Sequence, residues 1–112
     1  MRATEWKTAV IRRDRARCVV TGEPAQEIHH ILGRRRPRGF KQMPPEIKDE
    51  WPDVEPNLAC VTLATHQWAH RLGRYAKRIL LTDLLENHGG REWQGRPYRE
   101  WLSEPPFAEF LH

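Results

Sequence analysis

The sequence has few cysteines and no long apolar segment. It contains two cysteines, Cys18 and Cys60, in 112 residues, too few for a disulfide framework and enough for at most half of a four-thiolate zinc site. No apolar run approaches the roughly 20 residues of a membrane-spanning helix, and the opening stretch MRATEWKTAVIRR lacks the apolar core and cleavage site of a signal peptide. We therefore expect a soluble, cytoplasmic protein with no membrane partner, in which both cysteines are buried hydrophobes.

Basic residues exceed acidic residues only modestly, by 19 to 15, but 15 of the 19 are arginine. Arginine suits bidentate contact with phosphate better than lysine does, which favours a polyanionic partner. A net charge of +4 is equally consistent with simple solubility, so composition leaves both interpretations open. The length suits one domain, and we predict a single, monomeric domain over residues 1–112.

Local patterns predict an α+β fold. A helix is expected over residues 4–16 with Thr4 as its cap. Two short strands, Arg17–Val20 and Glu27–Ile31, are expected to form a hairpin through the turn residues 21–24. A third strand over 57–62 is followed by a helical segment from about Ala64 to Leu81. Its expected core stripe consists of Trp68, Leu72, Tyr75, Ala76 and Ile79.

Two further segments have distinct compositions. Residues 32–56 contain five of the nine prolines and a basic run, and we interpret them as a basic, proline-rich loop that becomes ordered on binding. Residues 82–112 form a C-terminal extension, in which the aromatic residues beyond Arg91 either fold back on the core or meet bases or a partner protein. These aromatic residues are Trp93, Tyr98, Trp101, Phe107 and Phe110.

Two histidines lie one helical turn apart. His66 and His70 share a polar helix face with Gly73, Arg74 and Lys77. Both imidazoles can converge on one atom, and Gly73 leaves room for a backbone to approach. Exposed helical histidines are common, so this pair alone leaves a metal site and an ordinary surface pair as alternatives.

Two more histidines upstream complete a recognisable pattern. The sequence reads EIHHI at 27–31 and PNLACVTLATHQWAH at 56–70, a histidine pair followed by N-L-x(7)-H-x(3)-H. Over residues 14–72 this arrangement resembles the HNH branch of the ββα-metal (His-Me finger) nucleases, and its all-histidine ligands resemble those of the colicin-type enzymes. The resemblance implies a ββα-metal core, with an N-terminal helix and a C-terminal helical, aromatic extension around it.

The resemblance also implies roles for individual residues. His29, His66 and His70 would bind one divalent metal ion, while His30 would act as general base. Asn57 would orient the imidazole of His30 or pin the hairpin loop. The residues expected to contact DNA phosphates are Arg34, Arg35, Arg36, Arg38, Arg74 and Lys77. Imidazole ligands favour Zn²⁺, Mn²⁺, Ni²⁺ or Co²⁺, with Mg²⁺ as a further ion that could support activity.

The chain departs from many HNH proteins in one respect. They carry two CxxC pairs that bind a structural zinc, whereas the corresponding positions here are Cys18 with Thr21 and Thr62 with Thr65. We expect no zinc of that type, and core packing in its place. The candidates for that packing are Trp6, Trp68, Ile79 and Cys60.

The expected function is that of a metal-dependent DNA endonuclease, which nicks or cuts DNA with little sequence specificity. Small HNH proteins often belong to phages, where some assist genome packaging, or to restriction and mobile elements, so packaging or restriction proteins are conceivable partners. One alternative is a non-catalytic, metal-stapled DNA-binding module in which all four histidines hold structure. A nuclease toxin ranks last, because no translocation or receptor segment is recognisable in the sequence.

Overall fold

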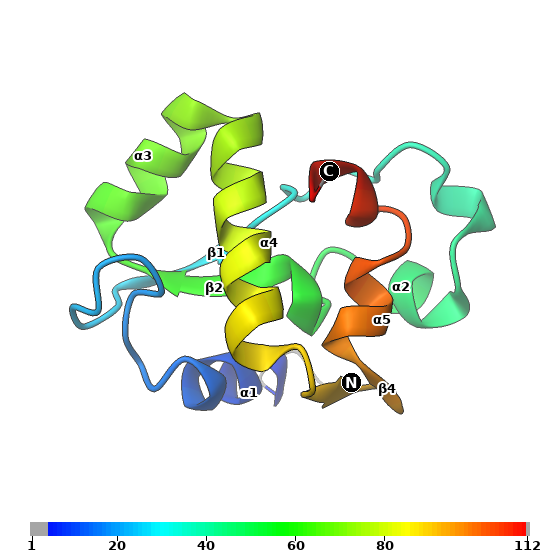
Figure 1. The fold of residues 1–112 in the computed structure, drawn as a ribbon, viewed down its shortest axis with the longest axis horizontal. Coiled ribbons are helices and arrows are strands. Elements are labelled where there is room, and N and C mark those ends of the chain that lie inside the picture. The colour runs from blue at the N-terminus through cyan, green and yellow to red at the C-terminus, as the bar shows by residue number, and fades with distance from the viewer. Residues whose placement is uncertain (1–4, 112) are drawn as a thin grey trace.

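The computed structural model describes residues 5–111 and has an α+β architecture (Figure 1). None of its helices is long and apolar enough to cross a membrane. Thr4, the expected helix cap, lies outside the described residues. The elements are α1 (Glu5–Arg13), β1 (Glu27–His30), α2 (Pro45–Glu50), β2 (Leu58–Val61), α3 (Leu63–Leu72), α4 (Arg74–His88), β3 (Glu92–Trp93), β4 (Arg96–Pro97) and α5 (Tyr98–Leu102), with short 3₁₀ helices at Phe40–Gln42, Glu55–Asn57 and Ala108–Phe110.

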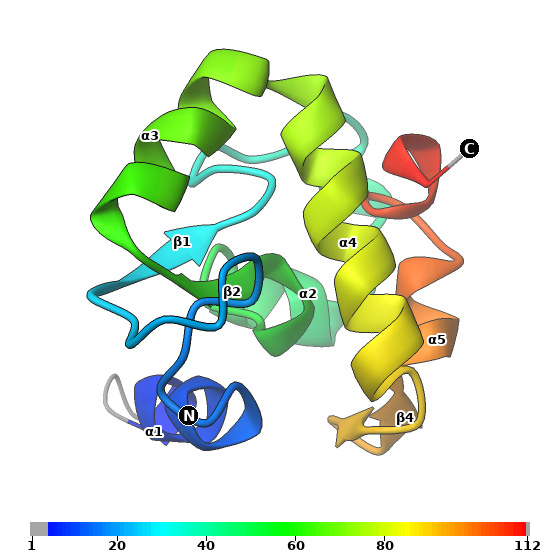
Figure 2. The same ribbon diagram turned by 60° about the vertical axis from the view of Figure 1, so that its left-hand side comes forward.

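A short antiparallel hairpin lies at the centre of the molecule. β1 pairs with β2 so that His29 is opposite Ala59 and His30 is opposite Leu58. All four residues of β2 are buried. The hairpin lies between α1 and α3, as Figure 2 shows, with α1 against β2 and α3 against both strands. Because successive side chains of a strand point to opposite faces, the two adjacent histidines meet different helices.

The expected pairing of Arg17–Val20 with Glu27–Ile31 is wrong. Residues 17–20 belong to a compact turn over residues 17–24, in which the Cys18 N–H donates to the Glu23 carbonyl at 2.7 Å and the Gly22 N–H donates to the Cys18 carbonyl at 2.9 Å. Arg17 and Pro24 form an isolated antiparallel bridge across it. Positive φ at Arg15 and Ala16 turns the chain just before this segment. The strand partner of β1 is β2, which lies about thirty residues further along the chain.

The long helix expected from Ala64 to Leu81 is broken at Gly73. This glycine has φ of 53° and ψ of −116°, in a region that side chains with a Cβ rarely adopt, so α3 ends before it and α4 begins after it. The break changes the helix face that is buried. Ala76 is buried and Trp68 packs against the core, whereas Leu72, Tyr75 and Ile79 are exposed. The apolar residues that α4 buries are Ala76, Leu80, Leu81 and Leu84.

Residues 32–56 are folded within the chain itself, contrary to the expectation of a loop that becomes ordered on binding. α2 starts at Pro45, where the missing N–H of proline costs nothing, and it buries Ile47. Met43 and Val54 are buried in the same core cluster. These buried apolar residues could not be recognised from the sequence, because the prolines between them interrupt any helical or strand periodicity.

The C-terminal extension folds back on the core, which is the first of the two alternatives that the sequence left open. Trp93, Tyr98, Trp101 and Phe107 are buried, and the Trp101 indole N–H donates to the Trp93 carbonyl at 2.8 Å. In Figure 1, α5 and the C-terminal turn lie alongside α4. The aromatic residues of this segment thus complete the core around α4.

Three of the four residues at positions 18, 21, 62 and 65, which the sequence comparison with HNH proteins singled out, contact one another. Cys18 Sγ lies 3.4 Å from Thr65 Oγ1, which in turn lies 3.0 Å from Thr62 Oγ1. Burial raises the pKa of the Cys18 thiol, but hydrogen bonds to Thr21 and Thr65 outweigh it and lower the pKa to about 6. Of the residues expected to replace the zinc by packing, Cys60 is buried and Trp6 and Trp68 pack against core clusters, but Ile79 is exposed.

A buried ionic network joins segments that are far apart in the sequence. Arg13 contacts both carboxylate oxygens of Asp14 at 2.9 Å and donates to the carbonyls of Glu55 and Leu58. Asp14 accepts from the Cys60 N–H at 3.0 Å. Tyr98 donates to Glu55 Oε1 at 2.6 Å. The network therefore ties α1 to β2 and to α5.

Replacing Arg13 with methionine should destabilise the fold strongly. The Arg13 and Asp14 side chains have no solvent exposure, so the variant leaves a buried carboxylate without its partner, at a cost of about 3–5 kcal/mol in unfolding free energy. Urea titration measures this loss. Arg12→Met is the matched control, because Arg12 is exposed and its loss should change stability by less than about 0.5 kcal/mol. Equal losses in the two variants would contradict the role given to the network.

Candidate metal centre

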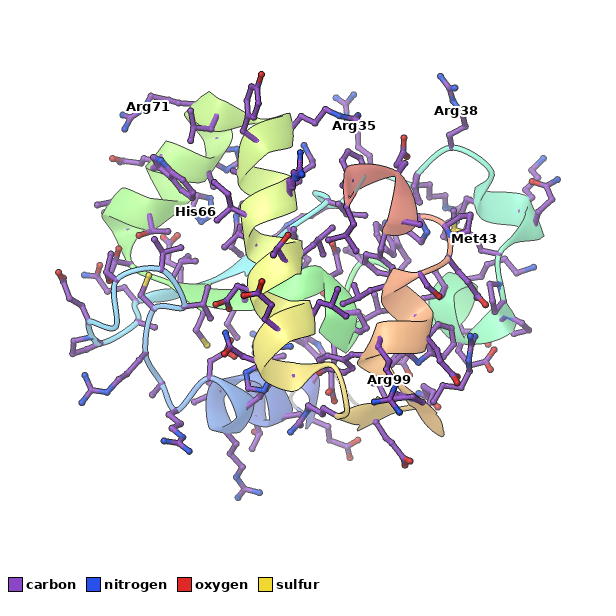
Figure 3. The ribbon with its side chains drawn as sticks, in the orientation of Figure 1. Arg35, Arg38, Met43, His66, Arg71 and Arg99 are labelled. Carbon is purple, nitrogen blue, oxygen red and sulfur yellow. The ribbon has the colours of Figure 1, made fainter. Side chains whose placement is uncertain are left out.

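Three histidines from two elements converge beside the hairpin. His29 extends from β1 toward α3, and its ring centroid lies 4.9 Å from that of His66 and 5.6 Å from that of His70. One nitrogen from each ring lies within 4.8 Å of the others. Figure 3 shows His66 on α3, pointing toward α4. The histidines expected to bind a metal therefore do come together.

The donor set fits a divalent transition-metal ion. The Nε2 atoms of His66 and His70 lie 2.8 Å apart, so the two rings share one hydrogen bond in which only one of them carries the proton. Ligand nitrogens on a tetrahedral ion at about 2.0–2.1 Å would be roughly 3.4 Å apart. A small outward rotation of these rings would therefore admit an ion in place of the shared proton.

His29 is held in the form that binds metals. Burial, reinforced by the positive potential of His66 and His70, lowers the pKa of His29 to about 4 from an ordinary value of 6.5. The imidazole is therefore neutral at physiological pH and offers a lone pair without first losing a proton.

A carboxylate accompanies His66. Glu27 lies two residues before His29 on the same strand, and its Oε2 is 2.8 Å from His66 Nδ1. The carboxylate lies off the direction of the ring N–H, so the buried Nδ1 atom has no hydrogen bond among the described residues. A ring rotation that brings Nε2 onto an ion could also align Nδ1 with this carboxylate, the arrangement that orients many histidine ligands.

His30 has a separate environment on the other face of β1. Its Nε2 atom lies 2.9 Å from Asp53 Oδ1, and its ring centroid is 6.2 Å from that of Trp6 on α1. The His30 side chain is 9 % exposed and that of Asp53 is 38 % exposed. A carboxylate partner at Nε2 favours the tautomer whose proton is on Nε2 and whose lone pair is on Nδ1.

Asn57 fixes the segment that joins β1 to β2, which differs from the turn of the expected hairpin at residues 21–24. Its side chain is completely buried. The amide oxygen accepts from the Leu32 N–H at 2.8 Å, and the amide nitrogen donates to the carbonyls of Pro52 at 3.0 Å and Gly33 at 3.3 Å. None of these bonds reaches the imidazole of His30, so Asn57 acts on that ring only through the backbone.

A small cavity of about 110 Å³ lies beside two of the three candidate ligands. His29 and His70 line it together with His30, Gly73 and Lys77. Lys77 also contributes to the positive potential at His29. The cavity thus places a cationic side chain and open space next to the candidate ligands, as an anionic substrate would require.

The predicted DNA-binding residues fall into two groups. Arg34, Arg35, Arg36 and Arg38 are exposed. Figure 3 shows Arg35 and Arg38 at the same margin of the molecule as Arg71, which follows the candidate ligand His70 on α3. Arg74 is instead occupied by the C-terminal segment, since it donates to the Glu109 carbonyl at 3.0 Å and its guanidinium lies 4.9 Å from the Phe110 ring centre.

Sequence reasoning missed Glu27 and Asp53. Glu27 had a detectable signal, because residues 27 and 29 share one face of a strand. Asp53 lies in an irregular proline-rich segment and meets His30 through a contact 23 residues apart, which no local pattern reveals.

Comparison of the chain with models of known protein families, with curated proteins and with solved structures finds no match.

Replacing His66 or His70 with alanine should weaken metal binding. Because an ion that binds only the folded chain raises its stability, each variant should lose most of the increase in melting temperature that Zn²⁺ or Mn²⁺ produces, and should change less in EDTA. Calorimetry with and without metal measures both effects. Equal melting shifts in the two conditions would mean that these histidines only pack.

The pKa of His29 predicts a pH dependence for the metal-free protein. The unfolded chain protonates this residue below its ordinary pKa of 6.5, whereas the folded chain resists until about 4. Between these two pH values the unfolded chain binds a proton at His29 that the folded chain does not. The unfolding free energy therefore rises with pH across this range, and it no longer depends on the protonation of His29 above it. In EDTA, His29→Asn should flatten the slope of melting temperature against pH between these limits. An unchanged slope would contradict the assignment of His29 as a buried neutral imidazole.

Proposed function

We propose that the protein is a metal-dependent DNA endonuclease of the HNH type. The observation that carries this proposal is the division of the histidines: His29, His66 and His70 converge on one point, while the adjacent His30 pairs with Asp53 on the other face of β1. Phosphodiester hydrolysis requires an activated water and charge stabilisation at phosphorus from separate groups held close together. The order of strand, strand and helix around this site also agrees with a ββα-metal core.

In this proposal His30 activates the attacking water. Asp53 holds the Nε2 proton, which leaves Nδ1 as the acceptor for a proton from the water. As positive charge develops on the ring, the nearby carboxylate stabilises it. A divalent ion held by the three histidines would supply charge for a nonbridging phosphate oxygen and for the leaving 3′ oxygen. The products would carry 5′-phosphate and 3′-hydroxyl ends, as the resemblance to HNH nucleases implies.

The exposed arginines provide the DNA contact. Arg34, Arg35, Arg36 and Arg38 directly follow the loop that Asn57 pins to the end of β1, so a duplex that contacts them passes close to His30. Lys77 lines the cavity next to the ligands and would contact the phosphate nearest the ion. Contacts to phosphates carry no sequence information, which supports low sequence specificity.

The alternative is a metal-stapled DNA-binding module without activity. Such a site closes with four protein ligands, whereas a catalytic site keeps one position open. Among the described residues the candidate ligand group has three histidines and excludes His30, which favours the nuclease.

The role of His30 predicts a selective loss of catalysis. His30→Ala should lower plasmid nicking by about 10²–10⁴-fold, the usual contribution of a general base, with little change in metal affinity. Nicking in the presence of Mn²⁺, Ni²⁺, Co²⁺, Zn²⁺ or Mg²⁺ and metal titration measure the two effects, with EDTA as the blank. His88→Ala, a histidine outside the site, is the matched control and should retain activity. Loss of metal binding in His30→Ala would show that His30 is a ligand.

The arginine run predicts a change in salt dependence. Each phosphate contact contributes about 0.9 to the slope of log affinity against log salt. Arg35→Gln/Arg36→Gln, in a His30→Ala background, should weaken binding to all DNA sequences alike and flatten the slope by roughly one to two units. Exposed charges contribute little to stability, so melting should not change.

A double variant on the other side of the molecule serves as the control. Arg99 lies at the margin opposite Arg35 in Figure 3, and Arg12 is exposed on α1, so Arg12→Gln/Arg99→Gln removes the same charge without touching the run. It should keep the original slope. Equal slopes in all three proteins would show that the run does not contact DNA, and would leave Arg71 and Lys77 as the candidates for that contact, with Arg74 only if it is released from Glu109 and Phe110.

A further inference from the structure

A second, larger cavity is lined by His30 but by none of the three candidate ligands. Its volume is about 410 Å³, within the roughly 300–1,000 Å³ of small-molecule sites. Trp6 and Ile11 of α1 and Ile28 of β1 supply apolar walls, and His30 forms part of the lining. This cavity is distinct from the small one beside His70, and His30 is the residue that lines both.

Two cations and one carboxylate line this cavity. The cations are Lys7 and Arg34, and the carboxylate is that of Glu27, which lies 2.8 Å from His66 Nδ1. Lys7 Nζ lies 5.5 Å from the centre of the Trp6 ring. Arg34 is also the first residue of the exposed arginine run. A flat apolar wall with cations at its edge suits a ligand that has a planar ring and a phosphate, which is the chemistry of a nucleotide.

We propose that this cavity, here called the Trp6 cavity, binds the base of an unpaired nucleotide next to the scissile phosphate. The inference deepens the proposed nuclease function and rests on it. Trp6 is the stacking surface, and Lys7 and Arg34 contact the phosphates on either side of the bound base. The preferred substrate is therefore DNA with an unpaired nucleotide at the cutting site, such as a single strand, a bulge or a mismatch.

The position of His30 links the cavity to the reaction. Because His30 lines both cavities, a phosphate bound at His30 would place its own nucleoside next to the Trp6 cavity. A base within a duplex is stacked on both sides and presents only its edges in the grooves. It can reach an aromatic wall beside α1 only after leaving the stack, and this costs least where the base is already unpaired.

The test compares oligonucleotides that have the same phosphates but different bases. A short single strand, the same strand with every base removed, and the matching duplex are titrated by fluorescence anisotropy in EDTA, where no cutting occurs. Stacking of one base should make the ordinary strand bind roughly five- to a hundredfold tighter than the abasic strand. The duplex should gain nothing from the cavity.

Two variants remove the effect in different ways. Trp6→Ala deletes the stacking ring, and because Trp6 also packs against a small core cluster, its melting temperature is measured alongside. Ala25→Phe keeps Trp6 and fills the cavity, which Ala25 lines. Both should bring the affinity for the ordinary strand down to that for the abasic strand. Tyr75→Ala is the matched aromatic control, since Tyr75 is 75 % exposed and outside the cavity, and it should keep the difference.

The same proteins are assayed for nicking of a plasmid and of a duplex with one bulged nucleotide. Preference for the bulge in the unaltered protein, lost in both cavity variants, supports the proposal. Nicking with no such preference, or a preference that survives in a folded Ala25→Phe variant, overturns it and leaves the nuclease proposal standing. Binding of bases that depends on Trp6 in a protein that cuts nothing with any metal would instead overturn the nuclease and leave a nucleotide-binding site.

Discussion

The hydrogen bonds of one buried amide hold the candidate site together. Asn57 immediately precedes β2, yet its side chain bonds to Leu32 and Gly33 just beyond β1 and to Pro52 in the segment between the strands. Its own carbonyl accepts from the Ile31 N–H at 2.7 Å. The amide therefore closes a segment of about twenty-five residues onto the hairpin. Removing it would leave several buried backbone groups without partners, each a costly loss.

This closure sets the geometry on both sides of His30. Ile31, which follows His30, is held from one direction, and Pro52, which precedes Asp53, is held from another. The ion-pair partner of His30 is thereby brought to it from an otherwise irregular segment. A side chain that touches neither the metal ligands nor the His30 ring can thus govern the position of the proposed base through the backbone alone.

The two faces of the hairpin separate two chemical environments. On one face, β1 presents His29 to the paired histidines of α3, where burial keeps its imidazole neutral. On the other face, His30 meets a carboxylate and an aromatic ring. Because the side-chain period of a strand is two, adjacent residues are the simplest way to place a metal ligand and a free imidazole near each other without both binding the same ion.

Local patterns in the sequence accounted for much of this arrangement. The α+β class and the strand at Leu58–Val61 follow from local composition, in particular from branched residues. The convergence of His29, His66 and His70 follows from the spacing of four along a helix and from a motif with tight separations. The break at Gly73 did not follow, because one glycine within a helical pattern is compatible with both a continuous and an interrupted helix.

Long-range contacts account for the remaining differences. Residues 17–20 have the composition of a strand, but they do not pair with β1, because β2 occupies that position. Which segment pairs with β1 is determined by tertiary contacts and not by local preference. Asp53 and the buried Arg13 network likewise depend on residues distant in the chain. The apolar anchors of residues 32–56 were masked by the prolines between them.

The central claim is that the metal centre has three histidine ligands and an open position, with His30 outside it. Cobalt substitution followed by X-ray absorption and visible spectroscopy tests this most directly, because both methods report the ligands of the ion itself. The account predicts three imidazoles with an exchangeable oxygen ligand, and a spectrum that His30→Ala leaves unchanged. Four imidazoles, with one lost in His30→Ala, would contradict it and identify a closed structural site.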